Sequence, residues 1–133
     1  MGTVGYLLDT HTFLWAAHEE GTRLSENVKE LFAAPGAPIY VSAVSAYEIM
    51  NKYRIGKLPD YAHVAENYLS ILSEFGAYEL PLYTAHTHLA GEMVWEHRDP
   101  FDRILAAQSY VDNLTLVTSD PVFQSLPWMT ILW

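Results

Sequence analysis

The chain has 133 residues, half of them apolar, which suits one globular domain over residues 1–133 with a real core. It has no cysteine, which excludes disulfides and thiolate metal ligands, and it shows neither a membrane-spanning run nor a secretory pattern, so a cytoplasmic protein is expected. The formal net charge of −9 argues against a nucleic-acid partner unless the cations are gathered locally.

The first half of the chain alternates strand patterns with helical patterns. The apolar stretch 4–8 predicts a short buried strand, and residues 11–19 then take up helical spacing. A Ser followed by an early Glu opens a helix over 25–34, which a Pro-Gly pair ends. The β-branched stretch 38–44 predicts a second strand, which passes into a helix over 45–56.

The second half continues the alternation. Residues 61–76 form the clearest amphipathic helix, with Gly76 as its end. The elements expected after it are a strand over 78–82, helices over 84–97 and 100–111, a strand over 113–119 and a last strand within 128–133. Strands that alternate with helices predict an α/β domain with a mostly parallel central sheet flanked by helices.

Four acidic residues fall where such a sheet places its ligand site. Asp9 follows the first strand, and Glu48 lies one turn into the helix after the second. Asp102 opens the helix before the fourth strand, and Asp120 follows that strand. The carboxyl ends of parallel strands share one edge, so these side chains are expected to converge. Because clustered carboxylates repel one another, a stable cluster implies a cation, and Mg²⁺ or Mn²⁺ suits oxygen ligands.

Each acid also has a purely structural explanation. Glu48 would close a capping box with Ser45, and Asp102 in a first helical turn is favoured by the helix dipole. Asp99 and Asp120 each precede a proline, as N-caps and turn residues do. The alternative is therefore a non-catalytic α/β protein that binds a partner and whose acids are helix caps. The coincidence of four acids at one edge favours a site.

Three long blocks of the sequence resemble PIN-domain proteins, and specifically the VapC-type ribonuclease toxins of toxin–antitoxin pairs. The blocks are YLLDTHTFLW, VSAVSAYEIMNKYRIGKL and HRDPFDRILAAQSYVDNLTLVTSDPVF, and together they cover nearly the whole chain. The resemblance implies a PIN fold and a metal-dependent endoribonuclease in which the four acids hold one or two Mg²⁺ or Mn²⁺ ions. It also implies a VapB-type antitoxin peptide as partner, a homodimer, and a role for Asp99 through water or as a helix cap.

The chemistry that such a cluster permits is metal-assisted hydrolysis of a phosphodiester. Thr10 and Thr118 are expected to orient carboxylates by hydrogen bonding. The cations gather in two windows beside the acids, and the expected contacts to RNA or to the antitoxin are Lys52, Arg54, Arg98 and Arg103, with Lys57 nearby. The six histidines show no metal-ligand spacing and are expected to be structural or surface residues, with His97 near the site.

Two other enzyme classes fit the sequence less well. A haloacid-dehalogenase-like phosphatase needs a second Asp two residues after the first, and here that position is His11. A receiver domain needs an adjacent acidic pair after the first strand and a lysine near the end, yet no lysine follows Lys57.

Overall fold

The computed structural model describes residues 4–18, 23–34 and 36–133. Within them, the strands form one sheet in the order β3-β2-β1-β4-β5, and every pairing in it is parallel. The strands are β1 (Tyr6–Leu8), β2 (Ile39–Ser42), β3 (Tyr78–Leu80), β4 (Thr115–Val117) and β5 (Ile131–Leu132). The strand order changes direction between β1 and β4, which is where open α/β sheets place their binding crevice.

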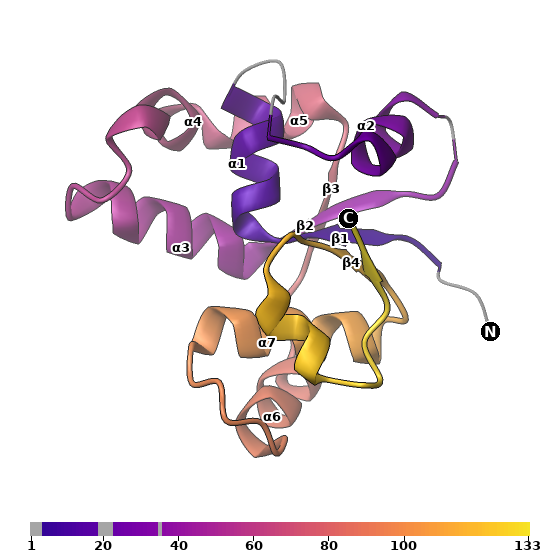
Figure 1. Ribbon diagram of the computed structural model, residues 1–133. Helices are drawn as coiled ribbons and strands as arrows, with labels where there is room; N and C mark the ends of the chain where they lie inside the picture. The colour runs from indigo at the N-terminus through magenta and orange to yellow at the C-terminus, as the bar shows by residue number, and fades with distance from the viewer. Residues whose placement is uncertain (1–3, 19–22, 35) are drawn as a thin grey trace.

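Helices cover both faces of the sheet (Figure 1). They are α1 (Thr10–His18), α2 (Glu26–Ala33), α3 (Ala43–Arg54), α4 (Ala62–Glu66), α5 (Tyr68–Phe75), α6 (Thr84–Glu92) and α7 (Pro100–Val111), with short 3₁₀ turns η1 (Pro59–Tyr61) and η2 (Pro121–Ser125). In Figure 1, α1, α2, α4 and α5 lie above the sheet, and α6 and α7 lie below it. The expected α/β architecture with a parallel sheet is therefore confirmed. None of these helices has the length and apolar character that a membrane span requires.

Two apolar cores lie on opposite faces of the sheet, because successive strand residues point to opposite sides. Leu8 and Val117 pack into the core under α1, α4 and α5, which also contains Phe13. Their neighbours Leu7 and Leu116 pack into the second core, under α7. All five side chains are fully buried. Strands buried on both faces explain why the sequence shows apolar runs there rather than an alternating pattern.

Two predicted helices are shorter than their sequence pattern suggests. The helix expected over 61–76 breaks at Asn67, whose side-chain amide donates to the carbonyl of His63 at 2.9 Å and so competes with regular helix bonding. Leu69 is largely exposed, although Leu72, three residues later in the same helix, is buried. Gly76 ends α5 in the left-handed conformation, as predicted, with φ at 84°.

The helix expected over 84–97 ends at Glu92, and the segment 93–99 is a loop that leads into α7. The predicted stop of α2 at Pro35 lies outside the described residues. In contrast, the predicted bounds of α7 agree with the structure, since Asp99 caps the helix and Pro100 occupies its first position.

Candidate active site

A cleft of about 400 Å³ lies at the carboxyl ends of the central strands. Carboxyl groups from separate parts of the chain line it, and they belong to Asp9, Glu48, Asp99, Asp102 and Asp120. Thr10, Lys52, Ser119, His11 and Trp15 also contribute to the lining. The structure therefore brings together the four acids that the sequence places at this edge, and it adds Asp99 to them.

Asp9 is held rigidly at the end of β1. Its Oδ1 accepts a hydrogen bond from the backbone of Thr12 at 2.7 Å, which caps α1, and its Oδ2 accepts one from the hydroxyl of Thr118. The residue is buried, and burial raises the pKa of its carboxyl above the usual range, although the bonds from Thr118 and Thr12 oppose that rise. A cation beside Asp9 would stabilise the ionised form. Thr118 thus has the orienting contact that the sequence suggests.

Glu48 is fixed by a different pair of contacts. Thr10 Oγ1 donates to Glu48 Oε1 at 2.7 Å, and Lys52 Nζ lies 2.6 Å from Oε2. The predicted capping box between Ser45 and Glu48 is wrong, because α3 begins at Ala43 and its N-cap is Ser42, three residues before Ser45. Ser45 instead shares a hydrogen bond of 2.9 Å with Thr10 inside the protein. Glu48 is therefore an internal helix residue whose carboxylate reaches the cleft without any capping role.

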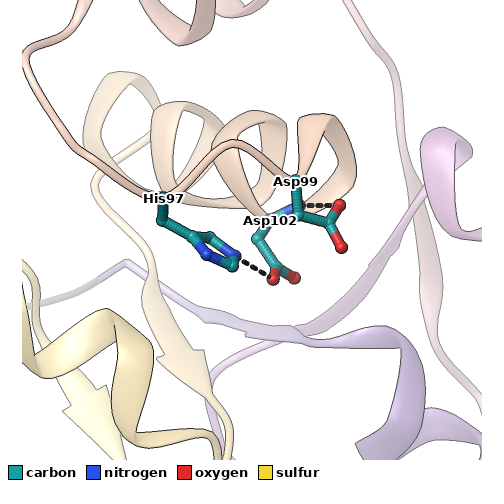
Figure 2. Close-up of side chains that lie close together, drawn as sticks. All are labelled: His97, Asp99 and Asp102. Carbon is teal, nitrogen blue, oxygen red and sulfur yellow. Dashed lines mark hydrogen bonds and ion pairs between the residues drawn. The ribbon is translucent and has the colours of Figure 1, made fainter.

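Asp102 lies in the first turn of α7 and contacts His97 from the preceding loop. Figure 2 shows the two side chains turned toward each other, with His97 Nε2 at 2.7 Å from Asp102 Oδ2. The pKa of Asp102 is raised to about 6, mainly by burial, and the hydrogen bond from His97 opposes this rise. The nearby charges of Asp99 and Asp120 contribute to the rise. This is the mutual repulsion expected of clustered carboxylates.

Asp99 and Asp120 act as helix caps while they line the cleft. Asp99 Oδ1 accepts from the backbone of Phe101 at 2.9 Å, and Asp120 Oδ1 accepts from the backbone of Val122 at 3.0 Å. Figure 2 shows Asp99 beside Asp102 at the start of the helix. Potential ligand atoms of His97, Asp99 and Asp102 all lie within 4.8 Å of one another. Carboxylate oxygens such as those of Asp99 and Asp102 suit Mg²⁺ or Mn²⁺, so these donors fit the metal ion that the sequence implies, while His97 supports Asp102 through its hydrogen bond.

Arg103 has an internal role instead of the RNA or antitoxin contact that the sequence suggests. Its guanidinium donates to four backbone carbonyls of the segment 90–97, those of Ala90, Met93, Trp95 and His97, at 2.6–2.9 Å. These bonds use four of the five N–H donors of the group. Arg103 therefore fixes the loop that carries His97 to the cleft.

The sequence analysis missed one wall of the cleft, formed by His11 and Trp15 of α1. Their rings lie 6.0 Å apart, and the guanidinium of Arg23 lies 5.8 Å from the centre of the Trp15 ring. The spacing of His11 and Trp15 could have revealed this wall, because residues four apart share a helix face and α1 starts directly after Asp9. No sequence signal places Arg23 there.

A parallel sheet with converging carboxylates at its switch point defines an α/β protein whose cleft suits a divalent cation. A family model described as the PIN domain matches residues 6–129, so the chain belongs to the PIN-domain family. PIN domains are generally nucleases. No curated protein matches the chain.

Several solved structures share this fold. VapBC from Salmonella typhimurium, bound to DNA, is 19% identical with a TM-score of 0.68, and the match covers 97% of each chain. VapBC2 from Rickettsia felis, bound to a fragment of promoter DNA, is 20% identical with a TM-score of 0.67 over 96% of each chain. VapC20 from Mycobacterium tuberculosis, described as a toxin that cleaves the sarcin–ricin loop, is 14% identical with a TM-score of 0.63, over 91% of this chain and 94% of that one.

Proposed function

We propose that this PIN domain is a metal-dependent endoribonuclease, the VapC-type toxin of a type II toxin–antitoxin system. The observation that carries the proposal is the convergence of five carboxylates in one cleft at the switch point of a parallel sheet. The solved VapBC complexes with the same fold and the RNA-cleaving VapC20 support the toxin and ribonuclease parts. Under this proposal the residues 1–133 act as one domain in the cytoplasm.

The residues that would hold Mg²⁺ or Mn²⁺ are Asp9, Glu48, Asp102 and Asp120. Once bound, the ion would supply Lewis-acid stabilisation of the phosphate charge and activation of water for in-line attack. Asp9 is kept in one orientation by Thr118 and by the backbone of Thr12, so it offers a preorganised oxygen. Thr10 does the same for Glu48.

His97 and Asp99 support the part of the cleft around Asp102. His97 holds Asp102 Oδ2, which sets the direction of the carboxylate. Asp99 is fixed by its capping bonds and adds negative charge beside Asp102. Asp99 therefore strengthens the attraction of this side of the cleft for a cation, whether it acts directly or through water, while His97 fixes the orientation of Asp102.

The remaining expected contacts concern RNA and protein partners. Lys52, Arg54 and Arg98 are proposed to contact the RNA backbone or an antitoxin peptide, while Arg103 is occupied inside the protein. Lys52 lines the cleft directly, beside Glu48. The proposal also includes a VapB-type antitoxin peptide that covers the cleft, which the VapBC structures support. A homodimer completes it.

The alternative, a non-catalytic partner-binding protein with capping acids, has one observation in its favour. Asp9, Asp99 and Asp120 all accept capping hydrogen bonds from backbone N–H groups. Capping does not account for Glu48, which lies inside α3 and contacts Thr10. The first-turn position of Asp102 does not account for its contact with His97. Capping also gives no reason for caps from distant segments to meet in one cleft. The metal-dependent nuclease explains both facts.

The test is calorimetric titration of Mn²⁺ into the metal-free protein, together with cleavage of mixed-sequence RNA. We expect saturable binding in wild type and a loss of at least tenfold in affinity in Asp102→Asn, with parallel loss of cleavage. Asp60→Asn is the matched control, because Asp60 is an exposed acid outside the cleft. Wild-type protein that neither binds Mn²⁺ nor cleaves RNA would refute the nuclease and favour the capping alternative.

A further inference from the structure

The cations near the cleft differ in how far the protein itself uses them. Lys52 forms a close ion pair with Glu48, and Arg54 donates to Asn51 on its own helix at 2.6 Å. The guanidinium of Arg103 is occupied by backbone carbonyls. Arg103 keeps only one N–H donor, whereas Lys52 and Arg54 keep donors for a polyanion after these contacts. An RNA strand that enters a cleft lined by five carboxylates therefore needs further cations at its rim.

Arg23 is such a cation, and it lies beside the wall that α1 contributes. Its guanidinium packs 5.8 Å from the centre of the Trp15 ring, and Trp15 itself lines the cleft with the acids. Arg23 is exposed, and no residue in the described part of the chain accepts a hydrogen bond from it. A cation–π contact orders the planar group without using its N–H donors. Arg23 is thus held in place with its donors available.

The position of Arg23 complements that of Arg98. Arg98 is exposed next to Asp99, which lines the cleft at the start of α7. Arg23 packs against Trp15 of α1, and α1 and α7 lie on opposite sides of the sheet (Figure 1). A cation therefore lies next to a cleft-lining residue on each side of the sheet. This arrangement suits a chain of phosphates that crosses the cleft, because the attraction at both rims offsets the repulsion at the centre.

We propose that Arg23, positioned by Trp15, binds a backbone phosphate of the RNA strand beside the acidic cleft. The inference rests on the proposed ribonuclease function and adds to it the path of the substrate, which runs from the acids along α1. The planar guanidinium binds two phosphate oxygens at once, which an ammonium group does not. Arg23 is a binding residue and Trp15 is a positioning residue.

The test measures binding of a fluorescently labelled, single-stranded 12-mer RNA of mixed sequence by anisotropy, with Asp102→Asn in every chain to prevent cleavage. Adding Arg23→Gln is expected to weaken binding about tenfold at low salt and to reduce the slope of log K against log salt by about 0.7, the value for one lost phosphate contact. Lys29→Gln is the matched control, because it removes the same charge from an exposed ion pair with Glu26. It is expected to change affinity less than twofold.

Two further variants separate positioning from simple charge. Arg23→Lys keeps the charge but loses the flat face, so we expect an intermediate affinity. Trp15→Phe keeps an aromatic ring in the wall of the cleft. We expect it to weaken RNA binding when Arg23 is present and to have no further effect when it is combined with Arg23→Gln. Without Asp102→Asn, Arg23→Gln should raise KM about tenfold and leave kcat within twofold, because Arg23 lies outside the acidic centre.

The outcomes distinguish this inference from the nuclease proposal. If the Arg23→Gln variant cleaves RNA with an unchanged KM, the role of Arg23 is overturned and the nuclease proposal still stands. Equal affinity losses in Arg23→Gln and Lys29→Gln would show a general charge effect and overturn it as well. If Arg23→Gln keeps its RNA affinity but loses a co-expressed protein partner, the guanidinium belongs to protein recognition and the inference fails. If wild type binds Mn²⁺ but cleaves no RNA, the nuclease proposal is contradicted, and the inference about Arg23, which rests on it, fails with it.

Discussion

Replacing Arg103 with Met should destabilise the protein strongly, even though the residue carries a charge and lies next to the acidic cluster. The side chain of Met keeps most of the aliphatic volume and removes the guanidinium. Four carbonyls between Ala90 and His97 then lose their donor at once. Because the loop loses its anchor, we also expect His97 to release Asp102 and Mn²⁺ binding to weaken.

The magnitude follows from the number and kind of these bonds. A hydrogen bond to a charged group contributes about 1.5–3 kcal/mol, so four independent bonds would give roughly 6–12 kcal/mol. That sum is an upper bound, because the contacts are part-buried and water replaces some of them. We expect a loss of about 3–5 kcal/mol in the free energy of unfolding, a large share of the stability of a typical domain.

The assay is urea unfolding followed by circular dichroism, with Arg98→Met as the matched control. Arg98 is an exposed arginine five residues earlier, and no described residue accepts a hydrogen bond from it. Its replacement is expected to change stability by less than about 0.5 kcal/mol. If Arg103→Met unfolds at the same urea concentration as Arg98→Met, the loop does not depend on the guanidinium and the reasoning is refuted.

Two further predictions concern the acids themselves. The pKa of the Asp102 carboxyl is raised from 3.8 to about 6 in the folded protein. The unfolded chain therefore releases this proton at a lower pH than the folded protein does. As a result, the metal-free protein loses stability as the pH rises from about 4 to 6. Asp102→Asn should therefore raise the free energy of unfolding by up to about 3 kcal/mol at pH 7 and have little effect at pH 4. Equal effects at both pH values would contradict the raised pKa of Asp102. Asp99→Asn should retain the helix cap, whereas Asp99→Ala should lower the free energy of unfolding in urea by about 1 kcal/mol. If the charge of Asp99 acts on the cleft, both variants should weaken Mn²⁺ binding to the same extent.

The parts of the fold that the sequence predicts well are those that local chemistry decides. The bounds of α7 follow from Asp99 and Pro100, and the end of α5 follows from Gly76. The failures have causes outside local patterns. Helix α6 ends early because carbonyls of its last turn and of the segment after it bind Arg103, which lies 6 to 13 positions later in the chain. The break at Asn67 depends on a side-chain bond that competes with the backbone, and composition alone does not reveal it.

The candidate site divides in the same way. The four acids can be placed together from sequence because each follows a strand end or lies in the helix beside one, and parallel strands share that edge. The partners of charged side chains cannot be placed so easily, since a long side chain can turn toward water, toward a substrate or back into the protein. Arg103 turns back into the protein, where backbone carbonyls accept its hydrogen bonds. The guanidinium of Arg23 instead packs against the ring of Trp15 at the surface.

Capping and metal binding are compatible roles for the same carboxyl group. A cap uses one oxygen, as Asp99 and Asp120 use Oδ1, and it fixes the position of the whole group. A second oxygen then remains with no described hydrogen-bond partner, on a side chain whose rotation is already restricted. A metal site needs such preorganised oxygens, because repulsion between carboxylates would otherwise drive mobile side chains apart. The caps that argue for a structural role when taken singly are therefore what allows these carboxylates to stay together in one cleft.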